Sequence, residues 1–283
     1  MTCVVPTSLS DALVALADEP GALVIAGGTD VMVEVNMGHR KPVSVVSVSR
    51  VSELRSWTHD PAARTVRLGA GVTYAEVMSE PLASLLPALA QAARTVGSPQ
   101  IRHAATIGGN VGTASPAGDG LPVLAALDAM VHLESLGGAR DVPFASFVLG
   151  PKRTVLQPGE LITAITVPVL DGWQGYAKVG VRNAMVIATA TCCLAADVPT
   201  SSVRIALGSV GPVIIRAVEA EAFAVAEVDL ASGRAAADVI ARIGSLAAAA
   251  ARPIDDHRST AAYRRHAIGV LASRLARRAF PHE

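Results

Sequence analysis

Two short glycine-containing segments have the residue types and spacing that best suit the binding of a phosphate ligand. The first, Ala26–Asp30, reads Ala-Gly-Gly-Thr-Asp, and the second, Thr106–Asn110, reads Thr-Ile-Gly-Gly-Asn. Glycine lets the backbone reach positive φ and lets a ligand approach without meeting a Cβ atom. Successive free N–H groups in such a turn form a concave site that suits a diphosphate. A third segment, Ala114–Asp119, follows the second, so we expect one extended phosphate ligand to lie between the loops.

Two polar side chains extend this interpretation from a phosphate to a dinucleotide. The amide of Asn110 can both donate and accept hydrogen bonds, and Asp119 can accept them from sugar-like hydroxyls. A flavin dinucleotide offers both a pyrophosphate and a ribityl chain. Neither loop has the Gly-x-Gly-x-x-Gly pattern, which argues against a Rossmann nicotinamide site. Taken alone, a Gly-Gly-Thr-Asp segment is also compatible with an ordinary strand–turn–helix corner.

The composition argues against several other classes of function. The 283 residues include 24 basic and 24 acidic side chains, so the formal net charge is zero and indicates no nucleic-acid or anionic-lipid surface. Aromatic residues make up 3% of the chain, which argues against base stacking. The apolar runs are shorter than the roughly 20 residues of a membrane span, and the N-terminus lacks signal-peptide features. We therefore expect a soluble cytoplasmic protein with neither a nucleic-acid partner nor a membrane span.

The three cysteines do not form a metal site in this sequence. Cys3 is far from the adjacent pair Cys192 and Cys193, and no Cys-x-x-Cys spacing is present. The apolar surroundings of the pair predict a strand, in which the two side chains point to opposite faces of a sheet. We expect core residues there, and a chain that cannot hold an iron–sulfur cluster by itself.

Alternating strands and helices must position the loops in the first part of the chain. The predicted strands are Ala22–Ile25, Val43–Val48, Arg64–Ala70, Val131–Ser135 and Glu160–Val169. The predicted helices are Leu9–Ala17, Val31–Met37 with Asp30 as its cap, a short one from Thr73, Leu82–Val96, and Leu121–Ala129. Residues 97–120 show almost no periodicity and predict an ordered, ligand-wrapping loop.

A composition shift at Asp171-Gly172 predicts a boundary, with one domain over residues 1–170 and another over 174–280. Strands are predicted at Gly175–Val181, Ile187–Asp197 and Ser202–Ser209, followed by helices at Arg216–Glu227, Gly233–Ala251 and Thr260–Phe280. Strands followed by helices are typical of an α+β layer, in which helices cover an antiparallel sheet.

Seven segments, in order, carry a resemblance to a known family: Ile25–Asp30, Gln100–Asn110, Ala114–Asp119, Leu124–Ala129, Tyr176–Arg182, Leu207–Pro212 and Ser259–Arg265. Together they resemble the FAD-binding (medium) subunits of molybdenum hydroxylases, the family of the carbon monoxide dehydrogenase medium subunit and the xanthine dehydrogenase FAD-binding subunit. The resemblance spans nearly the whole chain. It implies an α+β protein in which a PCMH-type FAD-binding fold of two α/β subdomains precedes a C-terminal CO dehydrogenase flavoprotein-like domain.

The same resemblance implies the cofactor-binding positions. They are Val24, Ile25, Ala26, Gly27, Gly28, Thr29, Asp30, Val31, Val96, Thr106, Ile107, Gly108, Gly109, Asn110, Asp119, Ile162 and Lys178. In such proteins the two glycine loops hold the FAD diphosphate and neighbouring groups. Lys178 aligns with a lysine near the flavin, and an ordinary surface lysine is the alternative. Ile162 aligns with an apolar residue beside the flavin ring, and a plain core residue is the alternative.

Two positions depart from the family pattern and leave the flavin environment open. Val96 stands where xanthine dehydrogenase has an aromatic contact, so that stacking is missing here. His103 stands where Asn or Ser is more usual, and a hydrogen-bonded loop residue is favoured there over a catalyst. Six arginines near the C-terminus form either a solvated face or a subunit contact: Arg258, Arg264, Arg265, Arg274, Arg277 and Arg278.

The function that the resemblance implies is that of one oxidoreductase subunit among three. A large subunit would carry molybdopterin and a small subunit two [2Fe–2S] clusters, with a dimer of heterotrimers as the family's assembly. Electrons would pass through the clusters to FAD on this chain and then to an external acceptor, so no residue here need attack the organic substrate. The alternatives are a self-sufficient PCMH-type flavin oxidase or reductase, and an assembly protein without flavin.

Overall fold

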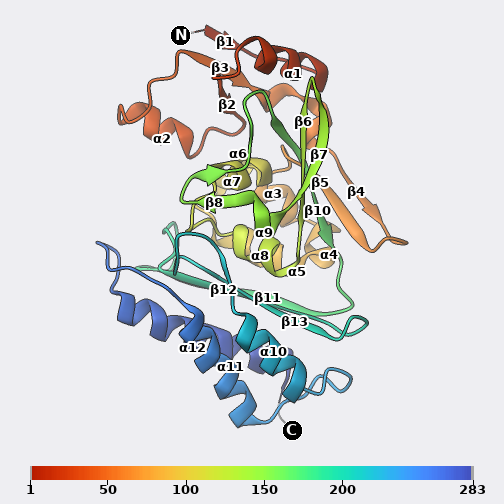
Figure 1. The fold of residues 1–283 in the computed structure, drawn as a ribbon, viewed down its shortest axis with the longest axis vertical. Coiled ribbons are helices and arrows are strands. Elements are labelled where there is room, and N and C mark those ends of the chain that lie inside the picture. The colour runs from red at the N-terminus through yellow and green to blue at the C-terminus, as the bar shows by residue number, and fades with distance from the viewer. Residues whose placement is uncertain (1, 282–283) are drawn as a thin grey trace.

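The computed structural model describes residues 2–281 and stacks the elements in three tiers (Figure 1). The N-terminal tier is a parallel sheet of order β1-β3-β2, made of β1 (Thr2–Val4), β2 (Leu23–Ile25) and β3 (Ser44–Ser47). Helices α1 (Leu9–Asp18) and α2 (Val31–Asn36) belong to this tier. The sequence offers Ser8 or Ser10 as a cap for this helix, and in the structure Ser8 caps α1 by accepting a hydrogen bond from the Asp11 N–H group.

The middle tier is built on a five-stranded antiparallel sheet of order β4-β5-β10-β6-β7. Its strands are β4 (Trp57–Asp60), β5 (Thr65–Gly69), β10 (Leu161–Pro168), β6 (Met130–Ser135) and β7 (Gly138–Pro143). Seven short helices belong to this tier: α3 (Tyr74–Val77), α4 (Leu82–Leu85), α5 (Pro87–Thr95), α6 (Pro99–Ala104), α7 (Ile107–Thr113), α8 (Leu121–Ala126) and α9 (Phe144–Phe147). A two-stranded ribbon, β8 (Val148–Gly150) with β9 (Arg153–Thr154), lies beside them, and the 3₁₀ turns Val48–Arg50 and Ser52–Arg55 join the first two tiers.

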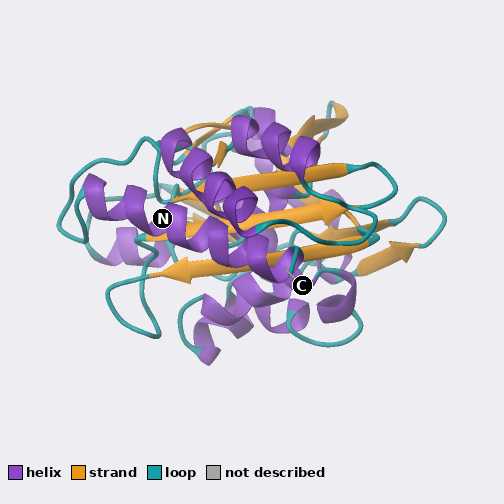
Figure 2. Ribbon diagram, turned by 90° about the horizontal axis from the view of Figure 1, so that it is seen from below, coloured by secondary structure: helices purple, strands orange, loops and turns teal. Residues whose placement is uncertain are grey.

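The C-terminal tier is an antiparallel sheet with three helices. The strands β11 (Gly172–Val179), β12 (Ala190–Asp197), β13 (Ser202–Gly208) and β14 (Ile215–Arg216) pair in that order. Helices α10 (Val218–Glu227), α11 (Ala237–Ala250) and α12 (Ala261–Ala279) cover the lower face of this sheet (Figures 1 and 2). The protein is therefore an α+β chain, as predicted.

Strand β12 shows how the two lower tiers are joined. All its residues from Ala190 to Asp197 are buried. Cys193 packs in the core that the C-terminal sheet shares with the middle tier, whereas Cys192 packs in the core under the three helices. The prediction that the two cysteines point to opposite faces is confirmed, and burial raises the pKa of the Cys192 thiol to about 12. The upper face of the C-terminal sheet thus forms the floor of the middle tier.

Two predicted segments have a different structure. The single helix predicted over 82–96 is two helices, because Leu86 precedes a proline and adopts φ −130° and ψ 60°. The irregular loop predicted over 97–120 is wrong, because α6 and α7 lie within it. The Ser98 hydroxyl caps α6 by accepting from the Ile101 N–H group, and the Thr106 hydroxyl caps α7 in the same way. None of the helices between residues 2 and 281 has the length and apolar character to cross a membrane.

Candidate cofactor-binding site

The first glycine loop presents unused backbone donors. It follows β2, which contains Val24 and Ile25, and it leads into α2, which begins at Val31. Gly28 adopts φ +69°, a conformation that favours glycine. The backbone N–H groups of residues 27–30 donate to no acceptor in the described chain. The Asp30 side chain forms no capping hydrogen bond, so its predicted role as a helix cap is wrong and its carboxylate is exposed.

The second glycine segment has its backbone donors already engaged. The N–H groups of Ile107 and Gly108 donate to the carbonyls of Val72 and Ala70, at 2.9 and 2.8 Å. The Gly109 N–H group donates to the Thr106 hydroxyl at 3.0 Å, and the Asn110 N–H group to the Thr106 carbonyl at 3.0 Å. This segment is therefore the first turn of α7, and the expectation of free N–H groups is wrong for it.

The first glycine segment lies against the chain that precedes the second. A Cβ atom added to Gly27 would lie 1.7 Å from the carbonyl oxygen of Ala104, at the end of α6. A Cβ added to Gly108 would lie 2.5 Å from the Cβ of Ala70, after β5. Both glycines permit backbone contacts that any other residue would block. The free donors of residues 27–30 therefore lie next to the chain that leads into α7.

Asn110 joins α7 to the third segment, Ala114–Asp119, and to Gly120, which follows it; the two together are the Ala114–Gly120 segment. A Cβ on Gly118 would lie 2.8 Å from the Asn110 Nδ2 atom, and one on Gly120 would lie 3.0 Å from its Oδ1 atom. The Gly120 position also lies beside the Tyr74 hydroxyl, at 2.8 Å. Asn110 Oδ1 and Tyr74 Oη are buried without a hydrogen-bond partner among the described residues. Such unpaired buried atoms are rare in proteins, and they fit a site that a polar ligand completes.

Asp119 lies at the centre of a buried polar cluster. Its Oδ1 atom accepts a hydrogen bond from the Tyr176 hydroxyl at 2.7 Å, and its Oδ2 atom pairs with Lys178 Nζ at 2.7 Å. Lys178 also donates to the carbonyl of Thr95 at 3.1 Å. Burial raises the pKa of the Asp119 carboxyl, and it outweighs the charge of Lys178 and the hydrogen bonds from Lys178 and Tyr176, which lower it. Both carboxylate oxygens therefore already have donors within the chain.

This cluster distinguishes between the two interpretations of Lys178. The side chain is only 7% exposed, which excludes an ordinary surface lysine. Tyr176 was not predicted as a site residue, although it lies two positions before Lys178 on β11. Residues two apart on a strand share a face, so the alternation of the strand was the signal that pointed to it.

The remaining predicted positions lie around these loops. Val96 is partly buried against the middle core, and its carbonyl accepts a hydrogen bond from Arg102 at 3.0 Å. Ile162, on β10, is 6% exposed, and its Cδ1 atom lies 3.4 Å from where a Cβ on Gly112 would be. His103 is exposed on α6, and its side chain has no hydrogen bond within the described chain, so the expected hydrogen-bonded loop residue is not found there.

Comparisons with known proteins agree over the whole length of this architecture. Residues 1–170 match the family model described as the FAD binding domain in molybdopterin dehydrogenase, and residues 176–279 match the CO dehydrogenase flavoprotein C-terminal domain. The glyceraldehyde dehydrogenase medium chain of Sulfolobus acidocaldarius is 32% identical, over 93% of this chain and 92% of its own length. The carbon monoxide dehydrogenase medium chain of Hydrogenophaga pseudoflava is also 32% identical, over 75% of each chain. Among solved structures, reconstituted CO dehydrogenase from Oligotropha carboxidovorans superposes with a TM-score of 0.89 and 28% identity, covering 99% of this chain and 97% of that one.

Proposed function

Because this chain belongs to the family of FAD-binding domains of molybdopterin dehydrogenases, we propose that it is the FAD-carrying electron-transfer subunit of a multi-subunit molybdenum hydroxylase. The observation that carries the proposal is the row of N–H groups at residues 27–30 that donate to no acceptor in the described chain, in a loop that lies against Ala104 at the end of α6. Backbone donors of this kind suit a diphosphate, and the Asn110 amide suits neighbouring polar groups of a dinucleotide.

Different residues of this chain would bind different parts of the cofactor. Residues 27–30 would donate to the diphosphate, and α7 would support that loop and present Asn110. Lys178 would lie near the flavin ring, with Asp119 as its fixed counter-ion. FAD, when bound, supplies redox chemistry that links one-electron and two-electron transfer. The chain's contribution is then to orient the ring and to set its electrostatic surroundings.

The Asp119–Lys178 ion pair would set the electrostatic surroundings of the flavin ring. At 2.7 Å the two charges largely cancel at a distance, so the ring would experience a dipole rather than an isolated positive charge. Tyr176 fixes the orientation of this dipole through its hydrogen bond to Asp119.

The proposal includes partner subunits. A small subunit with [2Fe–2S] clusters would deliver electrons, and a large molybdopterin subunit would oxidise the organic substrate, within a dimer of heterotrimers in the cytoplasm. Residues 1–170 would serve as the FAD-binding domain, and residues 174–280 would form its floor and reach towards the partners.

The test is an affinity purification of the tagged full-length chain from its native source, followed by absorption spectroscopy and metal analysis. We expect about one flavin per chain, together with iron and molybdenum in co-purifying chains. A colourless preparation that does not bind added FAD would contradict the proposal. A flavin that a small organic substrate reduces without partner chains would instead identify a self-sufficient flavoenzyme.

A further inference from the structure

Arg264 was predicted to lie on either a solvated face or a subunit contact, but it is one of the most buried charged residues of the chain. It lies on α12 and is 3% exposed. Its Nη1 atom donates to the carbonyls of Thr189 and Ser209, at 2.7 and 2.8 Å. Its Nη2 atom donates to the Asp256 carboxylate at 2.7 Å. A buried guanidinium is costly unless it is paired, and the bonds of its two Nη atoms hold it in one orientation.

The two carbonyls that Arg264 binds belong to residues that in turn hold the candidate site. The Ser209 N–H group donates to the carbonyl of Pro116 at 2.8 Å, inside the third segment. The Thr189 N–H group donates to the carbonyl of Val179 at 2.8 Å, next to Lys178 at the end of β11. The Arg264 side chain is therefore linked to the Ala114–Gly120 segment through Ser209, and to the strand of Lys178 through Thr189.

Unpaired buried atoms gather around the same segment. Among residues 2–281, the buried side-chain nitrogen and oxygen atoms without a partner are Tyr74 Oη, Asn110 Oδ1, Thr189 Oγ1, Ser209 Oγ and Arg264 Nε. The first two lie beside Gly120, and the other three belong to the junction around Arg264. Unpaired polar atoms weaken a fold, and in native proteins they call for a functional explanation.

We propose that Arg264 is a positioning residue for the candidate cofactor site, which fixes the Ala114–Gly120 segment and the Lys178 end of β11 through the backbones of Ser209 and Thr189. This inference depends on the proposed FAD site. Arg264 acts from the helical side of the C-terminal sheet and touches neither glycine loop. Removal of the Arg264 side chain should therefore make the Ala114–Gly120 segment and the Lys178 end of β11 more mobile, and it should leave the donors of residues 27–30 in place.

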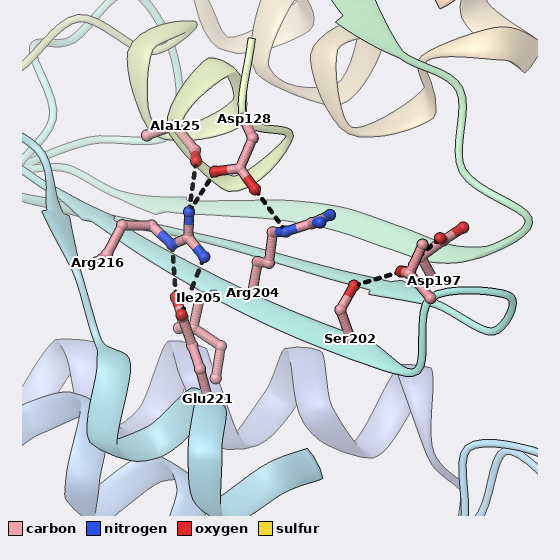
Figure 3. A network of polar contacts seen from close by, with 9 residues as sticks. Ala125, Asp128, Asp197, Ser202, Arg204, Ile205, Arg216 and Glu221 are labelled. Atoms are coloured by element: carbon pink, nitrogen blue, oxygen red, sulfur yellow. Dashed lines mark hydrogen bonds and ion pairs between the residues drawn. The ribbon is translucent and has the colours of Figure 1, made fainter. Parts of the chain in front are cut away.

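A second arginine, Arg216 on β14, provides a control that links the C-terminal tier to α8 (Figure 3). Arg216 Nη1 donates to the carbonyl of Ala125 at 3.1 Å and to Asp128 at 2.6 Å, near the end of α8 that is farther from Gly120. Its Nε and Nη2 atoms hold Glu221 at 2.6 and 2.9 Å. Arg216 thus joins the C-terminal tier directly to the end of α8, whereas the Arg264 side chain hydrogen-bonds, among the described residues, only to the C-terminal tier. Within the described chain, none of the residues that Arg216 binds donates a backbone hydrogen bond in turn to residues 114–120 or to β11.

The experiment compares Arg264→Lys with Arg216→Lys in the full-length chain. Lysine keeps the charge but concentrates its donors on one atom, which cannot reproduce the planar fork of arginine. We expect both variants to unfold at lower urea concentration. Only Arg264→Lys should weaken binding of added FAD, by about tenfold, and speed amide hydrogen exchange at residues 115–119 and 178–189. Equal FAD affinities and equal exchange at those residues in the two variants would overturn the inference.

A milder variant covers the case in which Arg264→Lys does not fold. Burial acts to raise the pKa of Asp256, but hydrogen bonds from the Arg258 N–H group and from Arg264 outweigh it and lower this pKa to about 2. Asp256→Asn removes that charge and keeps the Oδ1 acceptor, so we expect a loss of FAD affinity in the same direction, about threefold. An unchanged affinity in Asp256→Asn would count against the inference. Failure of the wild-type chain to bind FAD would refute the proposed function itself, which separates the two failures.

Discussion

The two glycine segments look alike in sequence, but they differ in how many of their backbone N–H groups are free to bind a ligand. Residues 27–30 keep their N–H groups free, whereas residues 107–110 donate theirs to Val72, Ala70 and Thr106. In the first segment, a glycine at φ +69° produces a turn with free donors. In the second segment, a capped helical turn lies against β5, and each N–H group of residues 107–110 already donates to an acceptor within the chain.

The glycines themselves also serve different purposes in the two segments. Gly28 is required by its backbone conformation, since a Cβ there would meet only the flexible side chain of Met32 at 3.2 Å and Ile25 at 3.6 Å. Gly108 is required by space, since a Cβ there would lie within 3 Å of backbone and side-chain atoms of Ala70. A glycine pair therefore marks a close approach of some kind, and only the hydrogen-bond pattern shows whether a ligand or another strand approaches.

The largest effect is expected for Gly108→Ala. The new methyl group would lie 2.5 Å from the Ala70 Cβ and 2.7 Å from its carbonyl oxygen, so the backbones must separate. We expect the free energy of unfolding to fall by about 3 kcal/mol, the upper end for overpacking, as measured by urea denaturation.

The adjacent glycine supplies the control for this variant. A Cβ on Gly109 would meet only the Thr106 hydroxyl at 3.0 Å, so Gly109→Ala should change stability by about 1 kcal/mol or less. Equal losses in the two variants would contradict a packing role specific to Gly108.

A smaller effect on stability, but a larger one on binding, is expected for Gly28→Ala. Alanine at φ +69° costs about 1 kcal/mol, and it disturbs the turn that presents the free N–H groups. We expect FAD affinity to fall by about tenfold, as measured by fluorescence titration of the full-length chain.

Gly38 makes the matched comparison, because it has φ +74° and a methyl group added there would have no atom within 4 Å. Gly38→Ala should lose the same stability and keep its FAD affinity. If both variants lose affinity equally, the first loop has no special part in binding.

Local signals in the sequence were sufficient for much of the fold. The capping box of Thr73 with Glu76, the apolar stretch of β12 and the α+β order of the C-terminal elements all depend on neighbouring residues. Boundaries shifted by a few residues, as at β11, where the strand begins at Gly172 instead of Gly175. The α6–α7 region was missed because three glycines, a proline and several small polar residues conceal two short capped helices.

The candidate site was less predictable because its decisive contacts connect distant residues. The donors of Ile107 and Gly108 find acceptors more than thirty positions away, at Val72 and Ala70. Arg264 reaches Thr189 across 75 positions, a contact that no local signal reveals. Its place three, four and seven positions before the buried Ala267, Ile268 and Leu271 was the signal that separates it from the exposed Arg265. Residue types and the family resemblance pointed to the candidate segments, but they could not show which of the segments' donors remain free.

The smallest effect is expected for Thr106→Val, and it is the sharpest test of the contrast between the segments. Valine has nearly the same shape but removes the acceptor of the Gly109 N–H group, so stability should fall by about 1 kcal/mol. Thr106→Ser keeps the acceptor and should retain most of that stability. Since the second segment supports the site through packing, FAD affinity should change by only about twofold in Thr106→Val. A marked increase in affinity would mean that the released Gly109 donor binds phosphate, and that the hydroxyl of Thr106 competes with the cofactor for it.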